Sequence, residues 1–345
     1  MPKKNKIPVI EEITIPSGNK LPKIGIDLLG SDSPPEELLA ALLKFFMELK
    51  GSAHLFLFGT QALFKGIPFP SLITPVPVSE VISMEDNPLS AIRHKKNSSL
   101  CTGIDMLKEG KLQAFISAGN TGALMAYAKM RLPDLPGIDR PALLTLLPSR
   151  QKEIAVLDVG ANTSFKAEHL YQFALMGVAY QKSRGIQTPT VGLLNIGTEA
   201  KKGTPELREA YKKLEKFNKP EKNKKAVFIG NIEGRDVFQG NIDVLVTDGF
   251  TGNVFLKTAE GIAGVILDQL EETAQEECSP LLKGMLAVLR TQLHYAEYPG
   301  ALLCGVDGIV MKCHGNTSSQ SFAHSIVSAV RLIKHDFINQ IRSHL

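Results

Sequence analysis

Short apolar runs alternate with longer stretches of helical periodicity from Lys23 onward, and this alternation restricts the fold more than any other feature. Strands that alternate with helices form a mostly parallel sheet with helices on its faces. The sequence therefore predicts an α/β fold. We expect strands at 23–27, 54–58, 114–117, 143–147, 154–158, 191–195, 226–230, 244–247 and 309–312, and helices at 35–49, 88–109, 121–131, 166–184, 205–217, 253–277, 281–294 and 318–342.

Residues 1–22 mix Lys, Pro, Glu and Gly without sustained periodicity, which predicts a flexible N-terminal extension before a domain at 23–345. The lysine-rich start is followed by no apolar segment of the signal-peptide kind, and no apolar run reaches membrane-spanning length. We therefore expect a cytoplasmic protein. The net charge of +4 is too small to indicate a nucleic-acid binder.

Several expected strand ends run into Gly-Asn or Ala-Asn pairs, at 119–120, 161–162, 230–231, 252–253 and 315–316. The carboxyl ends of parallel strands meet at one edge of the sheet, where open α/β sheets bind their ligands. Each pair is also ordinary turn chemistry on its own. Their recurrence at this edge predicts a binding site.

The segments around these pairs favour an anionic ligand. The turn 117–122 opens a helix, so its free N–H groups and the helix dipole suit an anion. The loop after 191–195 adds Lys201 and Lys202, and in the loop 230–236 Glu233 and Arg235 are spaced to pair and to direct a guanidinium at phosphate. Acidic residues, Asp158 and Asp248, follow two further strands, and His314 follows the last one.

The motifs of covalent catalysis and of metal binding are missing from the sequence. It contains no G-x-S-x-G elbow, no H-E-x-x-H pattern and no kinase signature. The four cysteines form no C-x-x-C pair and no cluster with histidines at zinc spacing. We expect no covalent nucleophile, no disulfide and no metal.

These blocks, in this order, resemble the acyl-acyl-carrier-protein:phosphate acyltransferase family, the PlsX proteins. The similarity begins at 26–32, I-D-L-L-G-S-D, where the family usually reads D-A-M-G-G-D. It continues through S-A-G-N-T-G-A-L-M (117–125), P-G-I-D-R-P-A (136–142), D-V-G-A-N (158–162), L-L-N-I-G (193–197), G-N-I-E-G-R-D (230–236) and D-G-F-T-G-N-V (248–254). Departures from the family pattern occur at Ser31, Ser164 and Ser318.

The resemblance implies transfer of a fatty acyl group from acyl carrier protein to inorganic phosphate, giving acyl phosphate for phospholipid synthesis. It implies a three-layer α/β/α fold like that of isocitrate and isopropylmalate dehydrogenases, a homodimer, and no cofactor. A membrane glycerol-3-phosphate acyltransferase would consume the product, which would bring this protein to the inner face of the membrane as a peripheral protein.

Site residues follow from the motifs and the resemblance together. We expect the turn 117–122 and the loop 230–236 to hold phosphate. Arg235, with one of Lys201, Lys202 or Lys257, supplies charge, while Asn120, Asn195, Asn253 and His314 donate to the oxyanion or to the leaving sulfur. Further substrate contacts are expected from Asp27, Gly30, Asp32, Gly119, Thr121, Gly122, Asp158, Asn162, Gly230, Asn231, Glu233, Asp248 and Gly252.

Alternatives remain at this stage. A phosphate acetyl- or butyryltransferase that uses coenzyme A would share the fold, and a non-catalytic module that binds lipid or carrier protein is a different class. The run 211–225 carries seven lysines against two glutamates and is either a dock for acidic carrier protein or a solvated helix end. The apolar face of 281–293 is either an interfacial membrane helix or a core or dimer surface.

Overall fold

The computed structural model describes residues 21–49, 51–219, 226–276, 284–286, 289, 300–313 and 319–344. Nearly all of the expected N-terminal extension lies outside the described residues, as do most of 281–293 and His314. The chain divides into two compact units, Met1–Pro133 with Val306–Ile338, and Asp134–Gly305 with Asn339–Leu345. We call them unit 1 and unit 2.

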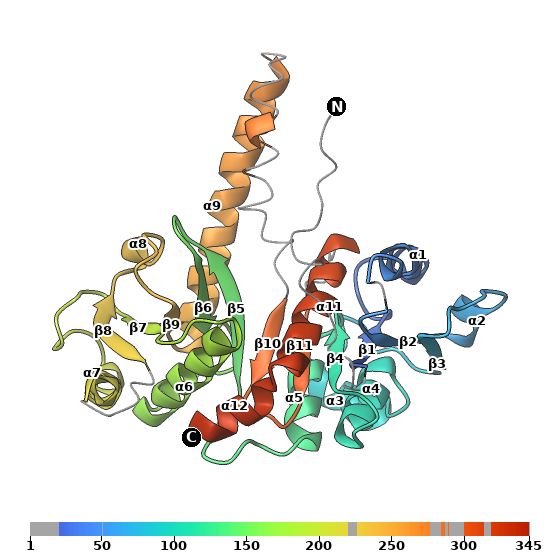
Figure 1. Cartoon of the computed structure of the whole chain (residues 1–345), viewed down its shortest axis with the longest axis horizontal. Coiled ribbons are helices and arrows are strands. Elements are labelled where there is room, and N and C mark those ends of the chain that lie inside the picture. The colour runs from blue at the N-terminus through green and yellow to red at the C-terminus, as the bar shows by residue number, and fades with distance from the viewer. Residues whose placement is uncertain are drawn as a thin grey trace. The chain divides into compact units, whose positions relative to one another are not determined.

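Unit 1 contains a fully parallel sheet in the order β3-β2-β1-β4-β11. Its apolar residues alternate between runs of period two and runs of helical period, which is why strands and helices alternate along it. Helices α1 and α11 pack together, as do α4 and α5, on opposite sides of these strands (Figure 1). The elements are β1 (Lys23–Asp27), α1 (Pro35–Phe46), β2 (His54–Gly59), α2 (Gln61–Phe64), β3 (Ile73–Pro77), α3 (Pro88–His94), α4 (Ser99–Lys108), β4 (Ala114–Ser117), α5 (Thr121–Arg131), β11 (Ile309–Lys312) and α11 (Ser319–Lys334). The last helix, α12 (Phe337–His344), begins in unit 1, and its residues from Asn339 onward belong to unit 2.

Unit 2 contains a mixed sheet in the order β10-β5-β6-β9-β7-β8, in which β6, β9, β7 and β8 are parallel and β5 runs antiparallel to both neighbours. Helices α6 and α7 pack together below this sheet in Figure 1, with α8 and α9 above it. The elements are β5 (Ala142–Pro148), β6 (Glu153–Leu157), α6 (Ala167–Ser183), β7 (Thr190–Leu194), α7 (Pro205–Leu214), the 3-10 turn η2 (Glu215–Asn218), β8 (Val227–Ile232), α8 (Gly234–Val237), β9 (Val244–Val246), α9 (Gly249–Glu276) and β10 (Ala301–Cys304).

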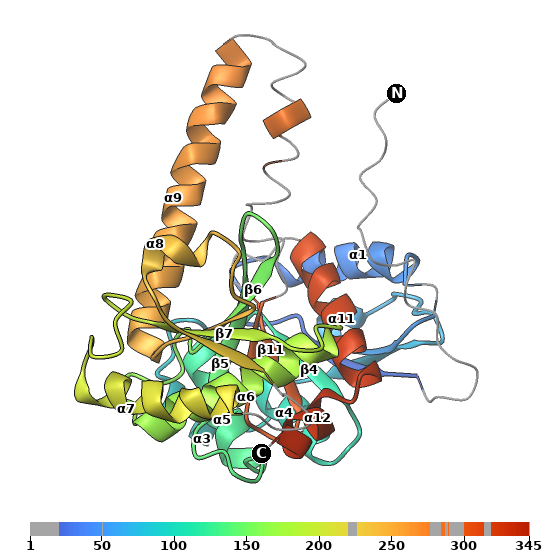
Figure 2. The ribbon, with the colours of Figure 1, turned by 60° about the vertical axis from the view of Figure 1, so that its left-hand side comes forward.

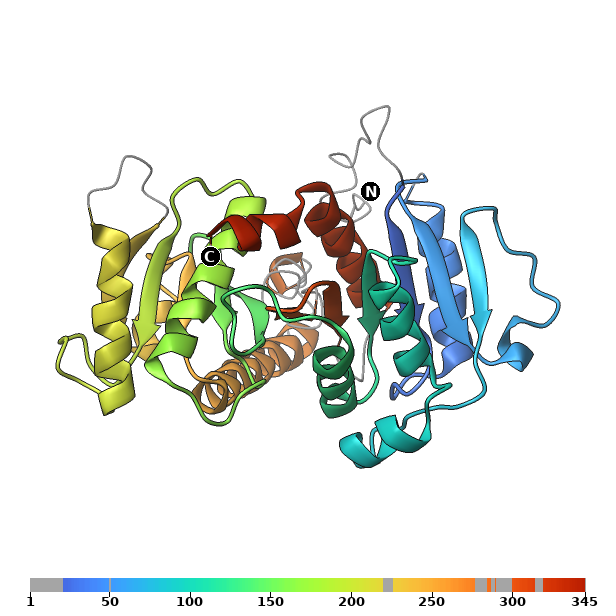
Figure 3. The same ribbon diagram turned by 90° about the horizontal axis from the view of Figure 1, so that it is seen from below.

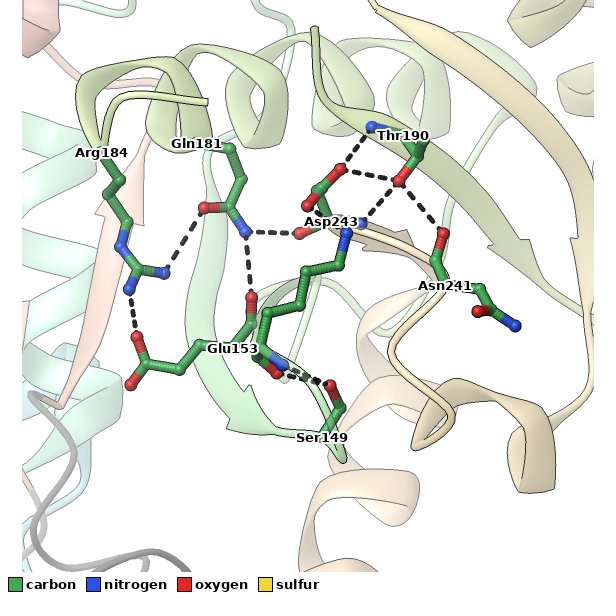
Figure 4. Close-up of polar contacts among 8 residues, drawn as sticks. Ser149, Glu153, Gln181, Arg184, Thr190, Asn241 and Asp243 are labelled. Carbon is green, nitrogen blue, oxygen red and sulfur yellow. Dashed lines mark hydrogen bonds and ion pairs between the residues drawn. The ribbon is translucent and has the colours of Figure 1, made fainter. Parts of the chain in front are cut away.

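A partly buried polar cluster fixes the amino ends of the unit 2 strands (Figure 4). Asp243 accepts hydrogen bonds from the N–H and the hydroxyl of Thr190, both at 2.7 Å, and pairs with Lys152 at 2.6 Å. Gln181 of α6 donates to the carbonyl of Asp243, and Arg184 pairs with Glu153. These contacts lie at the edge opposite the strand carboxyl ends, so they set the register of the sheet and leave the other edge to loops.

Helix α9 is the longest helix of the described chain, and it extends from unit 2 well past the ends of the unit's strands (Figure 2). Ile262, Val265 and Ile266 are 47–58% exposed along this extension. In Figure 3, seen from below, α9 is the orange helix that lies beside the unit 2 strands. Within the described part of the chain, no helix combines the length and the apolar character that crossing a membrane requires.

Candidate active site

The carboxyl edge of the unit 1 sheet is organised by the buried carboxylate of Asp27 at the end of β1. Its Oδ1 accepts from the N–H of Leu29 at 3.0 Å, and its Oδ2 accepts from the hydroxyl of Ser117 at 2.8 Å. The Ser117 hydroxyl oxygen in turn accepts from the N–H of Gly119 at 3.0 Å. Strands β1 and β4 are neighbours at the point where the strand order reverses, which is where open α/β sheets form a ligand crevice. Asp27 therefore ties together the two strand ends that flank this point.

Asp27 also titrates within an unusual range for an aspartate. Burial raises the pKa of Asp27 to about 6, against the opposing effects of hydrogen bonds from Ser99, Leu29 and Ser117 and of the Lys312 charge. Lys312, at the end of β11, donates to the carbonyl of Ala118 at 3.1 Å. The turn after β4 is thus held from both neighbouring strands.

Asn120 is a structural anchor of this edge. Its Oδ1 caps α5 by accepting from the N–H of Ala123 at 3.0 Å, and its Nδ2 donates to the carbonyls of Ser83, Met84 and Asp86 at 3.1–3.2 Å. The side chain is only 6% exposed. Its amide group joins the start of α5 to the loop before α3. The expected donation by Asn120 to an oxyanion stays a prediction.

The other expected unit 1 residues lie around the same edge. Gly30 has a φ of +74°, and a Cβ there would lie 2.5 Å from the carbonyl oxygen of Ile82, so only glycine fits. Gly119 lies beside Asp27, and Thr121 and Gly122 are exposed in the first turn of α5. Asp32 is exposed on the loop that follows β1.

In unit 2 the corresponding position is taken by Asp158, directly after β6. This carboxylate is fully buried and accepts five hydrogen bonds, from the N–H groups of Leu143, Gly160, Ala161 and Asn162 and from the side chain of Asn162. Burial raises the pKa of Asp158, and these donors act against it. Asn162 also donates to the carbonyl of Pro141 at 2.8 Å. Asp158 and Asn162 are therefore the framework of the turn.

Helix α9 begins directly against that turn. A Cβ at Gly252 would overlap the carbonyl oxygen of Asp158, and one at Gly249 would lie 2.6 Å from its Oδ2. Asp248 accepts from the N–H of Thr251 at 2.9 Å, which holds the first turn of the helix. Asn253 is exposed on this turn, with its Nδ2 near Gly160. One turn further on, Lys257 donates to Glu260 at 2.8 Å.

The loop after β7 is folded around Asn195. The Asn195 side chain accepts from the N–H of Ile196 at 2.8 Å and donates to the carbonyl of Lys202 at 3.2 Å. Lys201 and Lys202 are exposed, and the ammonium of Lys202 lies 4.0 Å from Glu199. Asn195 thus holds both ends of a lysine-bearing loop.

The loop after β8 carries an exposed ion pair. Strand β8 continues to Ile232, so Gly230, which has a φ of +103°, and Asn231 lie within the strand and not, as the sequence predicted, in a turn that begins at residue 230. The Asn231 side chain donates to the carbonyl of Glu199 at 2.9 Å, which joins β8 to the loop after β7. Arg235 and Glu233 are 3.2 Å apart, as their spacing suggested, and the Arg235 side chain is 81% exposed. Its guanidinium is available to an anion from solution.

The sheet order of unit 2 brings four of these loops to one edge, because Asp158, Asp248, Asn195 and Glu233 follow β6, β9, β7 and β8, which are consecutive neighbours. A pocket of about 820 Å³ opens there between the end of β7, the start of α7 and the first turns of α9. Motif reasoning missed its apolar lining, including Phe250 and Val254. The sequence does contain a signal for this lining: Phe250 and Val254 are four residues apart just after an expected strand, and this spacing places both on one face of a helix.

The described cysteines are poor nucleophiles. Cys101, Cys304 and Cys313 are buried. Burial raises the pKa of the Cys101 and Cys304 thiols, which disfavours the reactive thiolate. Within the described part of the chain, the strand-end loops instead offer amides, carboxylates and cations.

Comparisons of sequence show one family, and comparisons with solved structures show the fold. The family model described as a fatty acid synthesis protein matches residues 22–340. The phosphate acyltransferase of Caldanaerobacter subterraneus is 39% identical over 330 residues, which cover 94% of this chain and 97% of the relative. A phosphotransacetylase from Streptococcus pyogenes has a TM-score of 0.61 at 15% identity, covering 91% of this chain and 94% of that one. A 4-hydroxythreonine-4-phosphate dehydrogenase from Klebsiella pneumoniae has a TM-score of 0.51 at 14% identity, covering 89% and 98%, so both structures share the three-layer α/β/α fold.

Proposed function

This chain belongs to the phosphate acyltransferase family, and we propose that it takes a fatty acyl group from acylated acyl carrier protein and passes it to inorganic phosphate. Acyl transfer to phosphate in phospholipid synthesis is the activity of the family, and the carrier protein as donor is the proposed part. The observation that supports it is the edge of unit 2, where polar strand-end loops adjoin a largely apolar pocket. Such an edge suits a reaction between an anion and a thioester with a hydrocarbon tail.

The proposed chemistry is direct transfer. A phosphate oxygen attacks the thioester carbonyl carbon, the tetrahedral oxyanion collapses, the carbon–sulfur bond breaks, and the sulfur leaves as a thiolate that takes up a proton. Phosphate is already a nucleophile at neutral pH, so the protein has to orient the reactants and stabilise the oxyanion. Orientation of the reactants lowers the activation free energy by roughly 7–11 kcal/mol, and one oxyanion donor lowers it by about 3 kcal/mol.

We assign roles to the expected residues accordingly. Arg235, which is exposed and held by Glu233, binds phosphate together with Lys201, Lys202 or Lys257. Asn253 and His314 donate to the oxyanion or to the leaving sulfur. Asn120, Asn195, Asn231, Asp158 and Asp248 act by holding the strand-end amides in place, since their side chains are bonded to those loops.

The proposed partners follow from the product. Acyl phosphate hydrolyses in water, so we propose a peripheral position at the inner face of the membrane, where a glycerol-3-phosphate acyltransferase consumes it, and a homodimer as the working form. The lysine-rich segment 211–225 is the proposed dock for the acidic carrier protein. Of its four described lysines, Lys212, Lys216 and Lys219 are exposed, and Lys213 pairs with Glu168 at 2.8 Å.

The test is a direct assay of acyl phosphate formed by the purified full chain. Palmitoyl-acyl carrier protein, palmitoyl-coenzyme A and acetyl-coenzyme A are compared as donors, with phosphate as acceptor. We expect kcat/KM to be highest for the carrier-protein donor by at least tenfold. A preference for acetyl-coenzyme A would instead support the phosphotransacetylase alternative, and binding of the carrier protein without turnover would support a non-catalytic module.

Direct transfer is tested in the same assay. We expect initial-rate plots to intersect when both substrates are varied, and mass spectrometry of the quenched enzyme to find no acylated residue. Parallel plots together with an acylated side chain would contradict the mechanism.

A further inference from the structure

The unit 2 pocket has the composition of a hydrocarbon site. Its volume is about 820 Å³, within the range of roughly 300–1,000 Å³ that small-molecule sites occupy. Its walls include Phe165 from the loop before α6, Leu207 from α7, and Phe250 and Val254 from α9. These side chains come from three separate segments and face one space, so the pocket is a property of the folded unit.

The rim of the pocket exposes large apolar side chains to water. Ile196 is 81% exposed, Phe250 65% and Val254 52%. A contiguous apolar surface beside a hollow marks a site for a ligand or partner, because leaving it in water is unfavourable. A ligand that buries these side chains recovers that free energy.

In the portion of the chain that the structure describes, five polar side chains line the pocket, and two of them, Thr163 and Thr204, precede α6 and α7. Asn195 and Asp248, which follow β7 and β9, line it together with Thr251. No lysine or arginine is among the described residues that line it, so a phosphate or nucleotide group would find no opposite charge there. The charged and amide groups of the pocket therefore lie at the strand ends, beside the loops of the candidate active site, and most of the remaining lining is apolar.

We infer that this pocket holds the hydrocarbon chain of the acyl donor and that the α9 side chain at position 254 limits the chain length it accepts. The inference rests on the proposed function, since it supplies the subsite for that substrate. The thioester lies at the polar strand ends, and the methyl end of the chain points between α7 and α9. A second copy of this protein covering the same apolar rim is the competing occupant.

The experiment uses a matched pair of substitutions on one helix. Val254→Trp fills the pocket, whereas Val265→Trp changes the same residue type at nearly equal exposure, 52% against 54%, away from the pocket lining. Octanoyl, dodecanoyl, palmitoyl and stearoyl donors are assayed with the wild type and both variants. Displacement of a fluorescent fatty acid, parinaric acid, gives a reading that does not depend on turnover.

In the wild type, each methylene that enters the pocket lowers KM about fourfold until the pocket is full. We expect Val254→Trp to raise KM for palmitoyl donors at least tenfold, to weaken parinaric acid binding equally, and to leave octanoyl donors and the KM for phosphate unchanged. Val265→Trp keeps the wild-type profile. Leu207→Ala enlarges the pocket at its opposite wall and shifts the preference towards stearoyl donors. This variant tests the inference if Val254→Trp does not fold.

Three results would overturn the assignment. The first is an unchanged chain-length profile and an unchanged parinaric acid affinity in both Val254→Trp and Leu207→Ala. The second is a change of the chain-length profile in Val265→Trp as large as that in Val254→Trp. The third is a change in oligomeric mass, measured by light scattering, that accounts for the effect of Val254→Trp. A wild type that forms no acyl phosphate from any donor contradicts the proposed function instead. Parinaric acid binding still decides the pocket in that case.

Discussion

Asp158 and Asn162 are joined twice, since Oδ2 of Asp158 accepts from both the backbone N–H of Asn162 at 2.8 Å and its side-chain Nδ2 at 2.9 Å. The remaining oxygen of Asp158 accepts three backbone N–H groups. A single buried carboxylate thus determines the conformation of the turn that follows β6. Asparagine in its place cannot accept all five donors.

Asp158→Asn is therefore expected to lower the free energy of unfolding by about 3 kcal/mol, because at least two buried donors lose their acceptor. Asp32→Asn changes an exposed carboxylate and should shift stability by less than about 0.5 kcal/mol. Urea denaturation followed by circular dichroism measures both. Equal midpoints for the two variants would show that the turn does not depend on Asp158.

The pH dependence of the free energy of unfolding should reveal the titration of the Asp27 carboxyl group. Because its pKa rises to about 6 on folding, the folded chain holds this proton more tightly than the unfolded chain. The contribution is fully present below the unfolded pKa, near 3.8, and is lost as the pH rises through about 6, a change of roughly 3 kcal/mol. Asp27→Asn stays neutral, so the stability of the wild type relative to this variant should fall between pH 4 and pH 7 and then level off. A difference that is flat over this range, or that rises, contradicts the assignment.

Gly252 and Gly261, both in α9, differ sharply in the space around them. Gly252→Ala should lower the melting temperature by several degrees or prevent folding, since its Cβ would overlap the backbone of Asp158. Gly261→Ala lies in open space on the same helix and should stabilise the protein by about 0.5–1 kcal/mol. Thermal unfolding of both variants decides the matter, and a tolerated Gly252→Ala would mean that helix and turn are not in close contact.

Asn120→Asp separates the two functions of this side chain. Aspartate still caps α5, but it has no N–H to donate to the carbonyls of Ser83, Met84 and Asp86. We expect hydrogen exchange of residues 83–86 to accelerate at least tenfold, with α5 still protected. Exchange that accelerates equally in α5 would indicate loss of the cap instead.

Arg235→Ala should raise the KM for phosphate about tenfold with a smaller effect on kcat, because it removes one charge-assisted contact with the anion. Arg150 is a matched control, since it is also exposed in unit 2 but follows the antiparallel strand β5, at the edge of the sheet opposite the candidate site, and donates to Gln239. Steady-state kinetics with phosphate as the varied substrate measures both. An unchanged KM in Arg235→Ala would remove this residue from phosphate binding.

The sequence predicted the buried strands well, because runs such as 23–27, 114–117 and 309–312 leave no amphipathic alternative; all three match observed strands. Two strands were missed. β3 carries Pro75 and Pro77, which argue against a strand but are tolerated at a sheet edge, and β10 is only four residues long. The single helix expected at 88–109 is two helices, α3 and α4, because Ser98 caps a new helix start.

The sequence predicted that several strand-end turns lie at one edge of the unit 2 sheet, whereas the roles of their side chains stay predictions. Strand-end turns follow from topology, so Asp158, Asn195 and Asp248 could be expected at one edge. The hydrogen bonds that these side chains make within the protein depend on tertiary contacts, which a local sequence pattern does not show. Asn120, for example, donates to three carbonyls of a loop more than thirty residues earlier in the chain. The apolar pocket was invisible to motif reasoning because its walls come from three segments that no local pattern connects.

The absence of clearance between Gly252 and the Asp158 backbone has a mechanical consequence. Helix α9 cannot tilt about its first turn without displacing the backbone amides after β6, so the helix and that turn move together. One end of α9 lies against the turn held by Asp158, and the rest of the helix extends from unit 2. A force applied to the outer end of α9 is therefore transmitted to the strand ends.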